Sequence, residues 1–417
     1  MKIKRYLLLI ILALWNLISV KAQNPIAAHF KDKLEKYLVK HPQVRDHIVV
    51  NDRGVYMFAS LQEKRANKPE YVFSWQQVTL FKQLCSRAPQ VARQLYLKNV
   101  PFNLPDSLKK TVRSHPTPLD TLPLRGVRIA IDPGHFAGDE KTARMEGRYI
   151  DITLANGTRV LFYESVLAWG TAKVLEKKLE AAGAKVLITR QKANLTALDM
   201  TFQQWYARYV RAQTSRGKRY LSPKQAFRQV LRAQDFKARV LKINAFQPDL
   251  TLIIHYNVDA TNSPWQQPTN KNFAMAFVGG AFYQEELNTP EKRFQLLRLL
   301  ITEDVEKSVR LSGHILQEHR RVLQVPTIEE PNQQSYLDKY CLYTGTKGVY
   351  TRNLSLSREI FGALCYGESL LQDNIQEIQQ LNQKSFVIDK WYFPARVNQV
   401  AEAYYRGIKN YWLSTNR

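Results

Sequence analysis

The sequence is poor in cysteine, in acidic residues and in long apolar runs, and each shortage excludes a class of protein. Three cysteines in 417 residues are too few for a disulfide framework, and one bridge at most remains open. We expect Cys365, which lies in an apolar run, to be a free buried thiol. Beyond the first 22 residues no apolar stretch is long enough to span a bilayer, so no transmembrane segment is predicted in the mature chain. With 45% hydrophobic residues, however, the chain can bury a sizeable core and is not disordered.

The shortage of acids leaves a net charge of +25. At the N-terminus Lys2, Lys4 and Arg5 precede an apolar run and a small-residue cleavage pattern, so residues 1–22 are interpreted as a signal peptide. Because the run is shorter than the about 20 residues of a membrane span, an uncleaved anchor is the weaker alternative. The mature protein is therefore expected in the periplasm or cell-wall compartment. There a basic protein meets anionic cell wall or lipid headgroups rather than nucleic acid, unless its charge only maintains solubility.

The pattern along the chain divides it into a small block and a larger domain. Residues 23–100 indicate an α+β block of unknown role, with a helix, a hairpin around Asn51 to Gly54, and further helical segments. A proline-rich linker is predicted over 101–124. From 125 to 417 strands alternate with helices, and the helix predicted at 165–182 leads into a strand at 185–190, a βαβ unit with parallel strands.

Two segments interrupt this larger domain. Residues 202–238 hold nine Lys or Arg against the single acid Asp235, interleaved with aromatics, and predict helices outside the sheet. A second insertion, about 262–346, includes a predicted strand and a helical region. A final amphipathic helix at 395–412 should cover a sheet face. The predicted fold class is α/β: a mostly parallel twisted sheet flanked by helices, with helical insertions and the small N-terminal α+β block.

Two short apolar runs each deliver one histidine. Ile129-Ala-Ile-Asp-Pro-Gly-His135 and Leu250-Thr-Leu-Ile-Ile-His-Tyr-Asn257 both predict buried strands, and their histidines would lie at the C-terminal edge of one sheet, where open α/β sheets hold ligands. A catalytic zinc uses three protein ligands, and two histidines with one carboxylate is a standard set. The alternative is that each histidine makes only structural hydrogen bonds.

The spacing along the sequence does not decide whether the third ligand is Glu140, Glu146 or Glu164. Glu164 is favoured because it opens the helix after the first strand, and the N-terminus of that helix would lie at the same sheet edge. His314 and His319, five residues apart on a predicted helix, do not share a face and are predicted at the surface.

These segments, in this order, resemble a known enzyme family. The chain is similar to the zinc-dependent N-acetylmuramoyl-L-alanine amidases of bacterial cell-wall turnover in Ile131-Asp-Pro-Gly-His135, in Glu164 opening a helix, in Gly183-Ala-Lys-Val-Leu-Ile-Thr-Arg190, and in Arg239 with Pro248-Asp-Leu-Thr-Leu-Ile-Ile-His-Tyr-Asn257. The likeness runs from about Val127 to the C-terminus, with two large interruptions.

In that family a His, a Glu and a second His bind Zn²⁺, and a second Glu near the chain end assists catalysis. The resemblance places these roles on the metal ligands His135, Glu164 and His255 and on the catalytic Glu368. The gap from His135 to Glu164 is longer than usual in the family, which keeps Glu146 as a rival. The family usually has an apolar residue before the late glutamate, where this chain has Tyr-Gly, so two other acids remain alternatives, Glu359 and Glu377.

The resemblance implies hydrolysis of the amide between N-acetylmuramic acid and L-alanine in peptidoglycan. Two neutral imidazoles and one carboxylate would leave zinc a net positive charge, so that bound water approaches a pKa of about 7 and Glu368 accepts its proton. The 202–238 insertion is then a wall that binds substrate, a solvated helical hairpin, or a lid moved by an activator protein, as related amidases with an insertion here imply. The alternatives are a zinc peptidase or deacylase on another wall amide, and a non-catalytic peptidoglycan-binding or regulatory protein.

Overall fold

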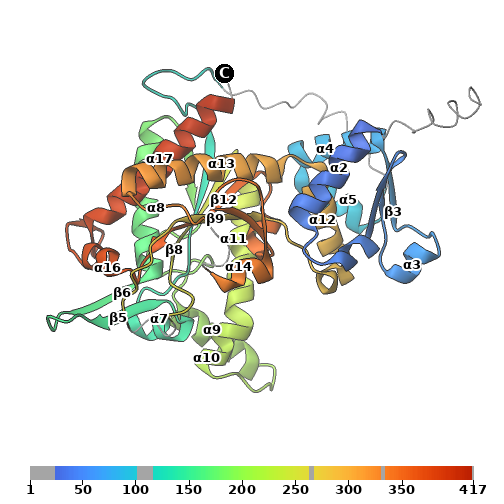
Figure 1. Cartoon of the computed structure of the whole chain (residues 1–417). Coiled ribbons are helices and arrows are strands. Elements are labelled where there is room, and N and C mark those ends of the chain that lie inside the picture. The colour runs from blue at the N-terminus through green and yellow to red at the C-terminus, as the bar shows by residue number, and fades with distance from the viewer. Residues whose placement is uncertain (1–23, 101–115, 263–266, 330–333, 416–417) are drawn as a thin grey trace, which may run out of the picture.

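The computed structural model describes residues 24–100, 116–262, 267–329 and 334–415 (Figure 1). The predicted signal peptide and residues 101–115 of the predicted linker lie outside these ranges. None of the described helices is both long enough and apolar enough to cross a membrane.

A seven-stranded sheet forms the centre of the molecule, in the order β10-β11-β9-β12-β8-β4-β7. Its four strands on the β7 side run parallel to one another, β9 and β11 run antiparallel to them, and β10 is antiparallel to β11. The predicted mostly parallel α/β sheet is therefore confirmed. In chain order the strands are β4 Arg128–Pro133, β7 Lys185–Ile188, β8 Leu250–Asn257, β9 Met275–Gly279, β10 Cys341–Tyr343, β11 Val349–Arg352 and β12 Ala363–Leu371.

Helices cover both faces of the sheet because its strands are apolar on both sides. Along β4, Ile129 and Ile131 enter the main hydrophobic core, whereas Ala130 between them packs with Ile243 and Ile253 on the other face. The first face carries α8 Glu164–Ala181, α13 Asp304–Glu318 and α17 Ala395–Thr415 (Figure 1), and the second carries α11 Arg232–Phe246 and α15 Ser355–Glu359.

The predicted last helix, α17, packs mainly on α8 and α13 and touches the sheet through Tyr404. The Tyr404 hydroxyl lies 3.0 Å from Ser369 Oγ of β12, and a Cβ at Gly367 would come within 2.2 Å of the same hydroxyl. Glycine at 367 thus lets α17 approach the strand that carries Glu368. Two small elements, α16 Ile375–Leu381 and the hairpin of β13 Phe386–Ile388 with β14 Trp391–Phe393, connect β12 to α17.

The N-terminal elements pack directly on the larger domain. The predicted hairpin is present as β1 and β2, with Asn51 paired to Gly54, and β3 adds a third strand that was not predicted. These elements contact α12 Pro290–Ile301, and buried Lys33 pairs with Glu306 at 2.8 Å across the junction. The N-terminal elements are α2 Pro25–Lys33, η1 Leu34–Leu38, η2 Pro42–Asp46, β1 Ile48–Asn51, β2 Gly54–Met57, α3 Leu61–Arg65, β3 Tyr71–Ser74, α4 Trp75–Arg87 and α5 Pro89–Leu97.

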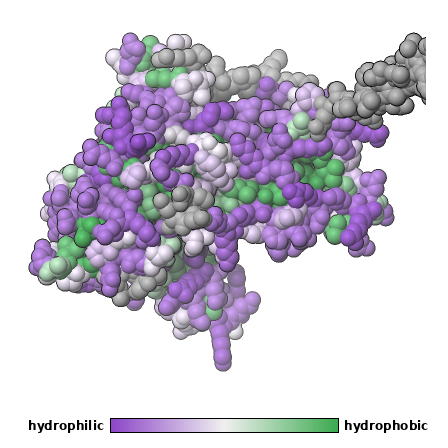
Figure 2. Space-filling view, viewed as in Figure 1, coloured by the Kyte–Doolittle hydropathy of each residue, from purple (hydrophilic) through white to green (hydrophobic). Residues whose placement is uncertain are grey.

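Three segments lie between the strands of the sheet. Between β4 and α8, a short helix α7 Glu140–Glu146 and a separate hairpin of β5 Tyr149–Thr153 with β6 Arg159–Tyr163 fill the unusually long gap. Residues 202–238 are helical and outside the sheet, as predicted, and their tip is mostly hydrophilic on the face shown in Figure 2. They comprise α9 Phe202–Thr214, α10 Pro223–Ala226, η3 Phe227–Leu231 and the start of α11. Residues 262–346 supply β9 and β10 to the sheet, together with η4 Gln284–Asn288, α12, α13, η5 His319–Leu323 and α14 Ser335–Tyr340.

The three cysteines and His319 lie inside the fold. All three cysteines are free and buried, which confirms the prediction for Cys365. His319, predicted at the surface, is instead 1% exposed, and its Nδ1 lies 2.9 Å from the Ile315 carbonyl. The prediction was wrong because the chain leaves the regular α-helix at His319 for a π-helical turn, and the edge of that imidazole packs on Tyr404 of α17.

Candidate metal centre and active site

His135 is set by the turn that follows β4. The residue adopts a left-handed conformation, with φ of 55°, which directs its side chain away from the strand's line. Two buried arginines hold the turn: Arg239 donates to the carbonyls of Pro133 at 2.8 Å and His135 at 2.9 Å, and Arg190 donates to the carbonyl of Gly134 at 3.0 Å. An uncommon backbone conformation is thereby fixed by charged hydrogen bonds.

Arg239 is itself held by two buried carboxylates. Its guanidinium lies 2.9 Å from Asp132 on β4 and 2.6 Å from Asp235, one helical turn earlier on α11. Asp235 Oδ1 also accepts a hydrogen bond from the backbone N–H of Ala197 at 2.6 Å. These buried charges are paired, so they tie the insertion to the strand that delivers His135.

His255 lies beside His135 because β4 and β8 are parallel neighbours, with Pro133 opposite Ile254. The two imidazole centroids are 4.7 Å apart and nearly perpendicular. A Cβ at Gly134 would lie 2.4 Å from Cε1 of His255, so only glycine leaves room for the ring in this position. On its other side the ring stacks on Tyr366 of β12 at 4.5 Å.

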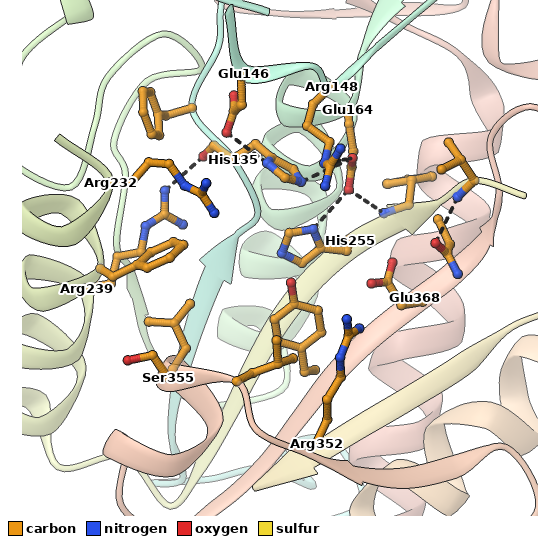
Figure 3. A pocket seen from close by; sticks show the side chains of 18 of the residues that line it. His135, Glu146, Arg148, Glu164, Arg232, Arg239, His255, Arg352, Ser355 and Glu368 are labelled. Atoms are coloured by element: carbon orange, nitrogen blue, oxygen red, sulfur yellow. Dashed lines mark hydrogen bonds and ion pairs between the residues drawn. The ribbon is translucent and has the colours of Figure 1, made fainter. Parts of the chain in front are cut away.

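Glu164 joins the two histidines from the first residue of α8, as predicted (Figure 3). Its Oε2 lies 3.1 Å from His135 Nε2, and its Oε1 lies 2.9 Å from His255 Nδ1. One ligand atom from each of the three side chains can be chosen so that all lie within 4.8 Å of one another. Two imidazoles and one carboxylate, converging from three elements, match the donor set of a catalytic zinc, and the predicted ligands are thus brought together.

Glu146, the alternative candidate for the third ligand, does not lie between the two histidines. It lies at the end of α7, 2.8 Å from Nδ1 of His135, on the side of the ring away from His255. A carboxylate on the second nitrogen of a ligand histidine fixes the orientation of the ring. Glu140 is remote from both histidines and pairs with Arg144 at 2.6 Å on the surface.

The electrostatics of the two histidines differ. Burial acts to lower the pKa of His135, but the carboxylates of Glu164 and Glu146 raise it to about 9. Burial lowers the pKa of His255 to about 4. For Glu164, burial opposes ionisation, yet the neighbouring imidazoles hold its pKa well below the ordinary value.

Glu368 lies on β12, directly opposite His255 in the parallel pairing with β8. It is 9% exposed and faces the same cavity. Burial, and then the negative charge of Glu164, raise its pKa to about 8. A carboxyl group with such a pKa can accept and return a proton near neutral pH.

The other two late acids are engaged elsewhere. Glu377 forms a buried pair with Arg396, with Nε 2.8 Å from Oε2. Glu359 accepts a hydrogen bond from Ser355 at 2.6 Å and does not line the cavity that holds Glu368.

A cavity of about 720 Å³ lies over the cluster. Phe136, Phe227, Tyr336 and Tyr366 supply apolar walls, and five arginines also line the cavity. Sequence reasoning singled out only Arg239 among these arginines, as part of the family resemblance, because the excess of basic residues is spread over the whole chain. They are Arg148, Arg228, Arg232, Arg239 and Arg352.

One family profile and several solved structures match this chain. No curated protein matches the chain. Similar solved structures include the CwlD amidase of Clostridioides difficile in complex with the GerS lipoprotein, at 16% identity and a TM-score of 0.38, covering 70% of this chain and 100% of that one. The N-acetylmuramyl-L-alanine amidase Ami1 of Mycobacterium smegmatis, at 13% identity and a TM-score of 0.39, covers 70% and 99% respectively. The family profile of N-acetylmuramoyl-L-alanine amidases, Amidase_3, matches residues 129–410, a range that includes His135, Glu164, His255 and Glu368, and the chain therefore belongs to this amidase family.

Proposed function

We propose that this chain is an exported, zinc-dependent amidase that cleaves the bond between N-acetylmuramic acid and L-alanine in peptidoglycan. The observation that carries the proposal is the buried cluster of His135, Glu164 and His255, whose ligand atoms lie within 4.8 Å of one another beneath a cavity. Membership of the amidase family supplies the substrate class. In this proposal the three clustered residues hold the metal, and Glu368 is the catalytic base.

The chemistry follows from the arrangement of these side chains. Zinc held here would supply a Lewis acid that lowers the pKa of a water to about 7 and polarises a carbonyl. Glu368 accepts one proton from the attacking water as the water oxygen bonds to the carbonyl carbon of the amide. The carbon–nitrogen bond then breaks, and Glu368 returns the proton to the departing amine of L-alanine. Its place opposite His255, facing the cavity over the cluster, suits both halves of this transfer, since one carboxylate must bind the proton and then release it.

The test separates metal binding from turnover. In Glu368→Gln the protein should retain zinc and lose at least about 10²-fold of its rate. Purified peptidoglycan is digested with wild type and variant, and mass spectrometry looks for free stem peptides and glycan without peptide. A fully active Glu368→Gln would contradict the assignment of the base.

The same digestion decides between the amidase and its alternatives. Cuts inside the stem peptide, or loss of acetyl groups, would identify a zinc peptidase or deacylase on another wall amide. Intact muropeptides with zinc bound would identify a non-catalytic peptidoglycan-binding or regulatory protein.

We further propose that the 202–238 insertion is a substrate wall. It contributes Phe227, Arg228 and Arg232 to the lining of the cavity. Deletion of residues 202–232, which spares Asp235 and its pair with Arg239, should lower activity if this is correct. An increase in activity would instead identify a lid, and an activator protein acting on it would then be the expected partner.

A further inference from the structure

Two arginines of the insertion face the cavity together. Arg228 and Arg232 are four residues apart on the continuous helical stretch that begins with α10, so they share one face of it. Figure 3 shows Arg232 pointing into the cavity from the wall across from Glu368. Phe227 and Phe236 line the cavity next to them, and both arginine side chains are exposed to solvent.

Neither arginine is neutralised by the protein. Among the described residues no carboxylate lies within ion-pairing distance of Arg228 or Arg232. The only acid of the insertion, Asp235, is already bound to Arg239 and to the backbone N–H of Ala197. Two charges are therefore presented to whatever enters the cavity.

The acids that line the cavity are not available to them either. Glu146 is bound to His135, and Glu164 lies between His135 and His255. Glu368 lies on the opposite wall, where the guanidinium of Arg352 is the cation that most lowers its pKa. An anionic group on the ligand is the natural partner of the unpaired arginines, because guanidinium groups bind carboxylates in a two-pronged geometry.

We infer that Arg228 and Arg232 form a subsite for a free carboxylate of the stem peptide, on the leaving-amine side of the scissile bond. The inference rests on the proposed function. In the substrate the lactyl carboxyl of N-acetylmuramic acid is consumed in the amide, and the N-acetylated sugars carry no charge. The substrate's carboxylates therefore lie on the peptide, and the subsite distinguishes stem peptides with free carboxylates from amidated ones.

The test uses two synthetic muramyl tripeptides that differ only in charge: one with its carboxylates free, and one with all of them capped as carboxamides. Zinc-loaded wild type should prefer the free acid by about tenfold in kcat/KM, the scale of a charged hydrogen bond with a partly exposed partner. In R228Q/R232Q the two peptides should have about equal kcat/KM, mainly because KM for the free acid rises. R208Q/R216Q is the control, because it removes two exposed charges of the same insertion that do not line the cavity.

A preference that R228Q/R232Q leaves unchanged would overturn the subsite, as would an equal loss on both substrates. Calorimetric binding of the two peptides to zinc-loaded E368Q, with and without R228Q/R232Q, gives the same comparison without turnover. If wild type cleaves neither peptide while the free acid still binds about tenfold more tightly through the arginine pair, the proposed function fails and the subsite stands. Equal binding of both peptides would overturn the subsite itself.

Discussion

Replacing Gly134 by alanine should weaken the metal centre without disturbing the fold. Gly134 has no left-handed φ, so alanine can adopt its backbone conformation, and its N–H can keep its 2.9 Å bond to the Ile254 carbonyl. The new Cβ, however, would lie 2.4 Å from Cε1 of His255 and 2.6 Å from both ring nitrogens. Because non-bonded carbon atoms rest at about 3.5–4.0 Å, the imidazole must retreat by roughly 1 Å.

A displacement of this size has a calculable effect. Misplacing one ligand should cost about 10–100-fold in zinc affinity, the range found when the groups that orient a ligand histidine are removed. This corresponds to about 1.4–2.8 kcal/mol. A further loss of turnover follows, because a shift of about 1 Å can cost 10²-fold in rate.

Competition with a chelator measures the affinity, and thermal unfolding with and without zinc measures the lost stabilisation. Gly313→Ala on α13 is the matched control, since its Cβ would meet only the end of the Thr346 side chain at 3.2 Å. If Gly134→Ala bound zinc as tightly as wild type, the placement of His255 against this glycine, or its role as a ligand, would be refuted.

Three further changes test the surroundings of the site and the core. Glu146→Gln should lower zinc affinity about 10–100-fold by freeing its histidine partner, and an unchanged affinity in chelator competition would show that this carboxylate is dispensable. Arg239→Met should destabilise the fold by about 3–5 kcal/mol in urea unfolding, because it leaves Asp132 and Asp235 buried without their cation; a loss below about 1 kcal/mol would contradict this. Burial lowers the pKa of His319 to about 4, so the unfolded chain binds more protons below its ordinary pKa of about 6.5, and stability should fall by about 2 kcal/mol from pH 7.5 to 5. His319→Gln should remove that part of the pH dependence, and an identical profile in urea unfolding would disprove it.

The sequence predicted the strands of the site better than their surroundings. His135 and His255 could be placed because parallel strands end at one edge of a sheet, and Glu164 because it opens the next helix. Glu146 could only be counted as a rival, since its position depends on how α7 folds back over His135. Residue spacing does not encode that path.

The role of the buried arginines in holding the turn at His135 could not be predicted, for a different reason. Arg190 and Arg239 have the same side chain as many exposed arginines in this basic chain, and only the folded structure shows them holding the turn at His135. The position and direction of β9 in the sheet could not be predicted either. A strand that runs antiparallel to β12, next to it in the sheet, leaves no mark on the pattern of apolar residues.

The position of β12 also sets when the active centre can form. This strand lies between β8 and β9, its Tyr366 stacks on His255, and its end is tied back by Gln372, whose side chain donates to the carbonyl of Tyr256, 116 residues earlier. Contacts between such distant parts of the chain form late, because a long loop must close first. During synthesis His135 and His255 emerge well before Glu368, so the nascent chain carries the proposed metal ligands before it carries the proposed base.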